Sequence, residues 1–304
     1  MSDENHVSFN KFAIRISVCL AVVFLAAFAV GTFFDHQVAE AVFSRGNVAA
    51  LVVSTLGIYV FCGAFSFYFG AALSQALKVK PRPKRILYST VVAILGICVM
   101  IGSGGSLLDI NNLGGIFPEV HRDVPQMAIT FFVVFLPVAV VGFVFGKKST
   151  DPRLGRRIVL ILNCMVIMFL AYELIKTGMP RPRFRLVSQN IEGIGFHAWF
   201  DPIQNKNDLI NTFNLNGDDF KSFPSGHTAN GIMSIAVLPG LAAVVPALKK
   251  RMTLLFFVGL VFGFAVLASR MVLGAHFLSD VSVGGFIASV ASAVYYKREE
   301  TLFR

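Results

Sequence analysis

Long apolar segments alternate with short polar linkers along almost the whole chain. A helix of about 20 apolar residues is long enough to cross the hydrocarbon core of a bilayer. The pattern therefore predicts an all-α fold, a polytopic transmembrane helical bundle with about eight spans. The predicted spans are residues 14–34, 49–77, 86–108, 127–146, 158–175, 227–248, 252–273 and 277–296.

The first apolar segment lies where a signal peptide would lie, but it differs from one in length. Its apolar part exceeds the roughly 7–15 residues of a signal peptide, and no small-x-small cleavage pattern follows it. We therefore expect residues 14–34 to be retained as a helix.

Composition supports the membrane assignment. Of the 304 residues, 55% are hydrophobic and only 14% are charged, which is far too apolar for a water-soluble domain. We expect an integral, multi-pass protein of the cell membrane.

Basic residues give the chain a net charge of +10, and their distribution predicts its topology. They cluster after the second, fourth and sixth spans, whereas the linkers after the first and third spans carry only Arg45 and Arg122. Cytoplasmic linkers are enriched in lysine and arginine, so both termini are expected in the cytoplasm. Clusters of this kind set topology more often than they bind nucleic acid, and we expect no nucleic-acid partner. The clustered residues are Lys78, Lys80, Arg82, Lys84, Arg85, Lys147, Lys148, Arg153, Arg156, Arg157, Lys249, Lys250 and Arg251.

A first group of candidate residues lies at the junction of the last two spans. His276 and Asp280 are four residues apart, so on a helix a carboxylate oxygen would reach one imidazole nitrogen. A histidine held in this way can act as a nucleophile or base, because the carboxylate sets its tautomer and stabilises the imidazolium. Arg270 adds a cation. The alternative is a structural His–Asp pair, but ionisable groups within apolar segments favour a functional site.

A second group opens the long segment 177–224 that follows the fifth span. Lys176, Arg181, Arg183 and Arg185 lie at the predicted membrane edge. Lysine as a point charge and arginine as a bidentate donor can surround a dianion such as phosphate. A basic membrane boundary without a ligand is the alternative.

A third group closes the same segment and leads into the sixth span. Ser225 and Gly226 are expected at a helix N-terminus, where free N–H groups and the helix dipole favour an anion. His227 would lie beside that anion and could protonate a departing oxygen. The alternative is a serine N-cap with an incidental histidine. Since all three groups fall on the same predicted outer face, together they indicate a phosphate site with a nucleophile and an acid.

These groups resemble the motifs of the type 2 phosphatidic acid phosphatase (PAP2) superfamily, namely K-x6-R-P, P-S-G-H and S-R-x5-H-x3-D. Residues 224–227 match the second motif and residues 269–280 match the third without change. In the first motif, Lys176 and Arg183 keep the six-residue gap, but Phe184 replaces the proline. Arg181 precedes a proline but at a gap of four. Of these two arginines, Arg183 is the favoured phosphate ligand and Arg181 the second candidate.

The resemblance covers residues 158–296 and implies a division of the chain. Residues 1–157 would hold N-terminal transmembrane helices, two of them additional to the six-helix core of the family. Residues 158–304 would form the PAP2-like catalytic region, with the long outer loop 177–224.

The resemblance also implies roles for individual residues. His276 would be the nucleophile, Asp280 its orienting carboxylate and His227 the acid for the leaving alcohol. The phosphate ligands would be Lys176, Arg183 or Arg181, Ser225, Gly226 and Arg270. The family needs no metal and no other cofactor. A magnesium enzyme would want a carboxylate cluster, and Arg270 would repel zinc from a site made of the two histidines and Asp280.

The implied reaction is metal-independent hydrolysis of a phosphate monoester or diphosphate on a membrane lipid, through a phosphohistidine. Phosphatidate, phosphatidylglycerol phosphate and polyprenyl diphosphate all fit a site at the outer membrane boundary. A lipid phosphotransferase using the same histidine and, less favoured, a lipid transporter are the alternatives. Phe196, Trp199 and Phe200 are expected either at the lipid interface or packed within the loop. The sequence carries no signal for the number of subunits.

Overall fold

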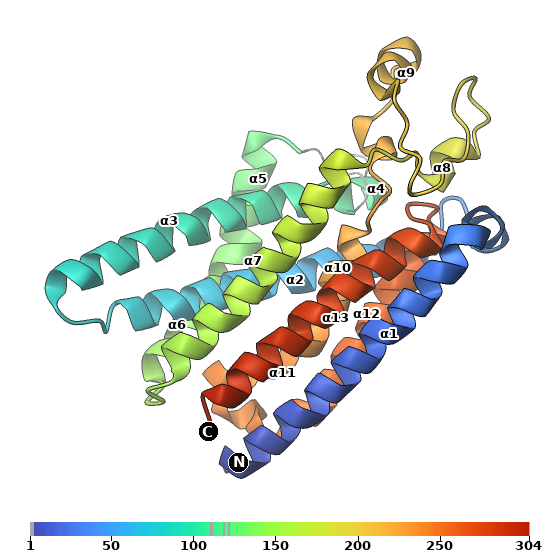
Figure 1. Ribbon diagram of the computed structural model, residues 1–304. Coiled ribbons are helices and arrows are strands. Elements are labelled where there is room, and N and C mark those ends of the chain that lie inside the picture. Colours follow the sequence, from blue (N-terminus) through green and yellow to red (C-terminus); the bar gives the residue numbers. More distant parts are fainter. Residues whose placement is uncertain (1–2, 110–111, 118, 121, 304) are drawn as a thin grey trace.

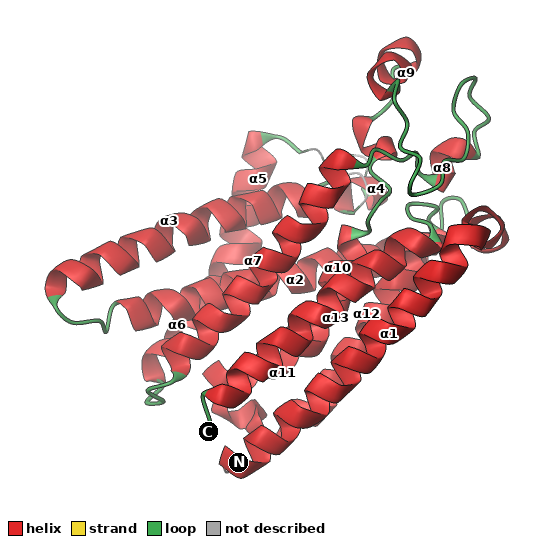
Figure 2. Cartoon of the chain, in the orientation of Figure 1, coloured by secondary structure: helices red, strands yellow, loops and turns green. Residues whose placement is uncertain are grey.

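A computed structural model describes residues 3–109, 112–117, 119–120 and 122–303. The described chain is a bundle of long helices and contains no β-sheet (Figures 1 and 2). Seven helical segments are long and apolar enough to cross a membrane, or eight if one bent pair counts as a span. The predicted helical membrane bundle is therefore confirmed. The long helices are α1 (Asp3–Val42), α2 (Val48–Ala76), α3 (Arg82–Leu107), α7 (Leu154–Gly178), α12 (Met252–Val272) and α13 (Leu278–Thr301).

The fourth span is a composite of three helical pieces. It consists of α5 (Val124–Thr130), a π-helical turn η1 (Phe131–Phe135) and α6 (Leu136–Lys148). The π-helical turn comes just before Pro137, which lacks the N–H needed to continue the α-helical ladder. A short helix α4 (Leu113–Ile116) lies in the preceding linker.

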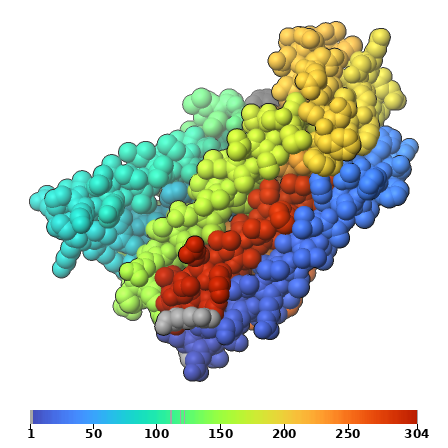
Figure 3. Space-filling model, viewed as in Figure 1, coloured from blue at the N-terminus to red at the C-terminus, as the bar shows by residue number. Residues whose placement is uncertain are grey.

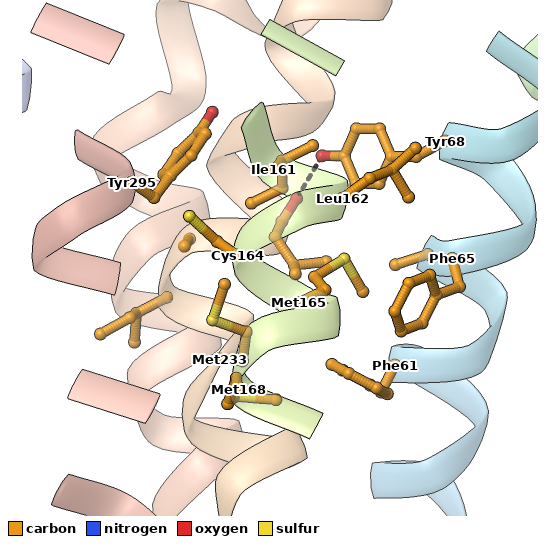
Figure 4. Close-up of a cluster of buried hydrophobic side chains, with 14 of the residues drawn as sticks. Phe61, Phe65, Tyr68, Ile161, Leu162, Cys164, Met165, Met168, Met233 and Tyr295 are labelled. Atoms are coloured by element: carbon orange, nitrogen blue, oxygen red, sulfur yellow. Dashed lines mark hydrogen bonds between the residues drawn. The ribbon is translucent and has the colours of Figure 1, made fainter. Parts of the chain in front are cut away.

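The sixth span differs from the single helix expected over residues 227–248. It is broken into α10 (Gly226–Ile232) and α11 (Ser234–Val244), which are bent by 44°. Pro239 in α11 leaves the Ile235 carbonyl without its usual donor, and the Tyr296 hydroxyl donates to that oxygen at 2.5 Å. Tyr68 donates to the Val237 carbonyl at 2.8 Å within the buried cluster of Figure 4. A turn η3 (Pro246–Arg251) then leads into α12.

Two helix pairs organise the bundle. Helices α1 and α13, from opposite ends of the sequence, run side by side along their length (Figure 1). Helix α6 packs closely on α2, where a Cβ at Gly70 would lie 1.8 Å from the Ala139 carbonyl oxygen. Small residues of this kind let helix backbones meet in lipid. Helix α3 contacts mainly α2 and α5 at the edge of the bundle.

The two ends of the bundle differ in character. At the end that holds both termini, Arg157 of α7 donates to the buried Glu299 of α13 at 2.7 Å, and His6 of α1 lies 3.5 Å from the same carboxylate. At the other end, the loop between α7 and α10 extends beyond the helices (Figure 3) and carries α8 (Phe184–Val187), α9 (Lys206–Phe213) and the turn η2 (Gly217–Phe220). The candidate residues lie under this loop.

Candidate active site

The structure brings the three sequence groups together at the loop end of the bundle. Lys176 lies in the last turn of α7, and a Cβ placed on Gly226 would be 3.2 Å from its Nζ. The Ser225 N–H donates to the Asp280 carbonyl at 3.0 Å. Segments separated by about 100 residues of sequence therefore share one site.

His276 is buried, and its tautomer is set by a backbone carbonyl. Its Nδ1 lies 2.5 Å from the oxygen of Ser222. Since a carbonyl can only accept, Nδ1 carries the proton and Nε2 keeps its lone pair. Nε2 is therefore the nitrogen that could attack an electrophile.

The prediction of a direct hydrogen bond between His276 and Asp280 is wrong. Nδ1 and the nearest carboxylate oxygen are 3.9 Å apart, which is too long for a hydrogen bond. The reason is that α13 begins only at Leu278, so His276 precedes the helix and the four-residue spacing does not put it on the same helical face. The Asp280 carboxylate instead turns back to cap its own helix and accepts from the Phe277 N–H at 2.7 Å.

Ser222 connects Asp280 to His276, and sequence reasoning missed it. Its hydroxyl donates to the Asp280 carboxylate at 2.5 Å, while its carbonyl accepts from His276. Asp280 can therefore orient the imidazole through Ser222. The only sequence signal was its position two residues before the P-S-G-H motif.

Arg181 is held by protein groups on all three of its nitrogens. Nη1 donates to Asp280 at 2.6 Å, Nη2 to Asp35 at 2.9 Å and Nε to the His197 carbonyl at 2.8 Å. Its guanidinium also lies 4.1 Å from the centre of the Phe277 ring. These contacts favour a structural role for Arg181 and leave Arg183 as the better candidate for phosphate. Asp35, in α1, was not among the predicted site residues.

Two other arginines are buried in the same region. Arg270 is 0% exposed, and although Nη1 donates to Ser54 at 2.6 Å, Nε and Nη2 have no hydrogen-bond partner among the described residues. Arg183 is 6% exposed, and burial together with the neighbouring Arg185 lowers its pKa to about 10. Arg183 therefore remains cationic at neutral pH. A fully buried guanidinium with two nitrogens that lack an acceptor among the described residues is unfavourable, so the position of Arg270 calls for an anion.

The same cations act on His276. Burial, followed by the positive charges of Arg183, Arg270 and Lys176, holds the pKa of its imidazole well below the usual value. His276 is therefore neutral near pH 7. A neutral imidazole with a free Nε2 is the form that a nucleophile requires.

Ser225 and Gly226 form the helix N-terminus that the sequence predicts. Ser225 is the N-cap of α10, and its hydroxyl accepts from the Thr228 N–H at 3.3 Å. A Cβ at Gly226 would lie 2.7 Å from the Tyr172 ring, so only glycine lets this turn approach α7 so closely. This close contact brings the turn to the Lys176 ammonium.

His227 is oriented by a residue from the linker after the third span. Its Nε2 lies 3.1 Å from Asn112 Oδ1. The Asn112 amide donates to the Ser106 carbonyl at 2.7 Å, which turns Oδ1 toward the imidazole and makes Nε2 the donor. Nδ1 is then the nitrogen through which His227 can take up and release a proton. Sequence reasoning missed Asn112, which belongs to none of the three groups.

A cavity of about 220 Å³ adjoins Arg270. Arg45, from the turn between α1 and α2, and Arg185 also line it, and Arg185 donates to Asp219 at 2.6 Å. Three arginines therefore line one small space. Its apolar lining includes Phe43, Leu51 and Leu273.

The loop aromatics mainly pack the loop onto the helices. Trp199 donates to Thr32 of α1 at 3.1 Å, and its ring centre lies 5.0 Å from that of Phe28. Phe196 contacts the Phe277 ring but is still 39% exposed, and Phe200 is 59% exposed. Of the two expectations, loop packing holds for Phe196 and Trp199.

No three His, Cys, Asp or Glu side chains in the described part of the chain lie close enough to hold a metal ion. This includes the set formed by His227, His276 and Asp280, which was considered as a zinc site. The candidate site is instead rich in cations.

Fold and site together define a multi-pass helical membrane protein with buried cations and two histidines at one end of its bundle. A family model described as the PAP2 superfamily matches residues 157–304, and this part of the chain belongs to that superfamily. The matched region holds all three motifs and leaves α1 to α6 outside it. No curated protein and no solved structure matches the chain.

Proposed function

We propose that the chain hydrolyses a phosphate monoester or diphosphate on a membrane lipid through a phosphohistidine, without a metal ion. Membership of the PAP2 superfamily supports phosphatase-type chemistry on lipid-like substrates. The observation that carries the proposal is Arg270, a fully buried guanidinium with two nitrogens lacking a described partner, close to a neutral histidine.

The proposed reaction has two steps. His276 Nε2 attacks phosphorus, and the P–O bond to the lipid breaks. The departing oxygen keeps the electron pair of that bond and takes a proton from His227. Water then attacks the phosphohistidine and gives its proton to His227, and inorganic phosphate leaves. Arg183, Arg270 and Lys176 would neutralise the phosphoryl oxygens, which is the main task in a loose phosphoryl-transfer transition state.

Phosphate release by the purified protein tests this proposal. We expect turnover of a lipid phosphate to continue in EDTA, because protein cations bind the phosphate. The assay should include phosphatidate, phosphatidylglycerol phosphate and a polyprenyl diphosphate, and should detect free phosphate. Activity lost in EDTA and restored by magnesium would contradict the proposal. Phosphate found on an added alcohol rather than in solution would indicate a phosphotransferase.

Within this panel we expect the diphosphate to be the best substrate. The cavity beside Arg270 is lined by Arg45 and Arg185 in addition to Arg270. While the terminal phosphate occupies the site at His276, these arginines could bind the second one and stabilise it as the leaving group. Equal turnover of monophosphate and diphosphate lipids would argue against this role for the cavity.

We also propose that the site faces the outside of the cell, with both termini in the cytoplasm. The basic linkers after even-numbered spans support this orientation. In a chain with its four cysteines replaced, a cysteine at Asn205, which is exposed in the loop, should react with an impermeant thiol reagent added to intact cells. A cysteine at Thr150, in the linker after α6, should not react. The reverse labelling would place the site on the cytoplasmic face.

A further inference from the structure

Helix α1 brings a buried carboxylate to the site from outside the region matched by the family. Asp35 is 3% exposed. One of its oxygens accepts from the Ser279 N–H at 2.8 Å, and the other accepts from Arg181 at 2.9 Å and from the Ser279 hydroxyl. A single side chain of α1 therefore contacts both the start of α13 and the loop arginine.

The packing of α1 on α13 fixes this carboxylate in place. A Cβ at Gly31, one turn before Asp35 on the same face, would lie 2.6 Å from the Ser279 nitrogen, so the two backbones touch here. Ser279 is the second residue of α13, and its N–H has no acceptor within that helix. A carboxylate at this position satisfies the donor and favours the positive end of the helix dipole.

Arg181 joins Asp35 to the interactions that hold His276. Its guanidinium donates to Asp35 and Asp280 at the same time. Asp280 accepts from the hydroxyl of Ser222, and the Ser222 carbonyl accepts from His276. Three residues, Arg181, Asp280 and Ser222, thus lie between Asp35 and the imidazole. Neighbouring residues in this series are joined by hydrogen bonds between buried groups.

We propose that Asp35 is a positioning residue for His276, an inference that rests on the proposed catalytic role of His276. Asp35 fixes Arg181 against Asp280 and caps the helix that begins just after His276. Its negative charge also contributes to the field at the imidazole. The first helix would therefore be part of the catalytic apparatus.

The charge contribution has a defined sign. When both carboxylates are ionised, Asp35, Asp280 and Arg181 together carry one net negative charge, which favours the imidazolium form of His276. Replacing Asp35 with Asn removes that net charge, so the pKa of His276 should fall further. Because attack needs neutral His276, kcat/KM decreases as the pH drops through the pKa of the free enzyme. In Asp35→Asn, the acid limb of the profile of kcat/KM against pH should therefore move to lower pH. The other groups facing His276 are Lys176, Arg183, His227 and Arg270.

The test compares Asp35→Asn with Glu299→Gln. Glu299 is also a buried carboxylate paired with an arginine, at the opposite end of α13. We expect Asp35→Asn to lower kcat roughly 10- to 100-fold with little change in KM, because a misplaced nucleophile costs rate rather than binding. Its acid limb should move to lower pH. Glu299→Gln should lower Tm but leave the pH profile of the remaining activity unchanged.

Two further variants guard against misfolding and check the charge. Asp35→Glu keeps the negative charge, so its acid limb should stay at the wild-type pH even if kcat falls. Arg181→Lys retains a cation but cannot span both carboxylates, and should lower kcat as Asp35→Asn does. If Asp35→Asn matches Glu299→Gln in kcat and pH profile, the proposal is wrong.

A measurement without turnover separates this inference from the proposed function. Exchange of the imidazole C2 hydrogen, followed by mass spectrometry of the peptide that contains His276, reports the pKa of that histidine directly. We expect a lower pKa in Asp35→Asn than in the wild type and no change in Glu299→Gln. An unchanged pKa in Asp35→Asn overturns the inference even if the wild type is an active phosphatase. A wild type inactive on every lipid phosphate overturns the proposed function, while the exchange result still decides the coupling of Asp35 to His276.

Discussion

His276→Ala should abolish phosphoenzyme formation and lower turnover by on the order of 10⁴-fold or more, while substrate binding is largely kept. The nucleophile is lost in this variant, but the cations Lys176, Arg183 and Arg270 remain. To measure the intermediate, the protein is mixed with substrate labelled on the terminal phosphate, and the reaction is stopped rapidly without acid. A phosphohistidine is recognised by its stability in alkali and its lability in acid.

His6→Ala is the matched control for this experiment. His6 is also a buried histidine, but it lies at the opposite end of the bundle beside Glu299. The His6→Ala variant should still form the phosphoenzyme. A labelled protein that persists in His276→Ala would show that another residue accepts the phosphoryl group.

His227→Ala should discriminate between substrates by their leaving groups. A lipid monophosphate leaves as a poor alkoxide, so losing the acid should cost on the order of 10²–10⁴-fold. Nitrophenyl phosphate has a leaving group that needs little protonation, so its turnover should fall much less. The measurement is the chemical step for both substrates, by single-turnover kinetics. His276→Ala, in contrast, should lose both activities alike.

Asn112→Ala gives an independent check of the same role. It leaves His227 in place but removes the acceptor that orients its Nε2. The loss should have the same dependence on leaving group and be smaller than that of His227→Ala. If nitrophenyl phosphate and the lipid are affected equally in both variants, His227 does not act as the acid.

Hydrophobic patterning predicted the helical bundle because apolar length alone decides which segments can cross a bilayer. It did not predict the break in the sixth span. Residues 227–248 are mostly apolar, and after the bend Tyr68 and Tyr296 supply donors from other helices to the Val237 and Ile235 carbonyls. Pro239 is the signal within the segment for a free carbonyl, but the tyrosines that pair with these carbonyls are too distant in sequence to be recognised.

Motif spacing identified the histidines and cations, but it did not give the contacts between them. The spacing of His276 and Asp280 suggested a helical pair, whereas the helix begins between them. Ser222, Asn112 and Asp35 are ordinary polar residues in the sequence, and only the fold brings them to the site. Asp35 in particular follows the first apolar segment immediately, where an acidic residue would simply indicate the end of a span.

Arg181 is paired with two buried carboxylates at once, so positions 35, 181 and 280 are not free to change singly during evolution. Losing the arginine would leave two carboxylates together without a cation, and removing one partner of a buried pair costs about 3–5 kcal/mol. That is a large part of the net stability of a typical protein. Among homologous chains, an acid at position 35 and an arginine at position 181 should therefore be gained and lost together. Such covariation would tie the ancestry of α1 to that of the catalytic half.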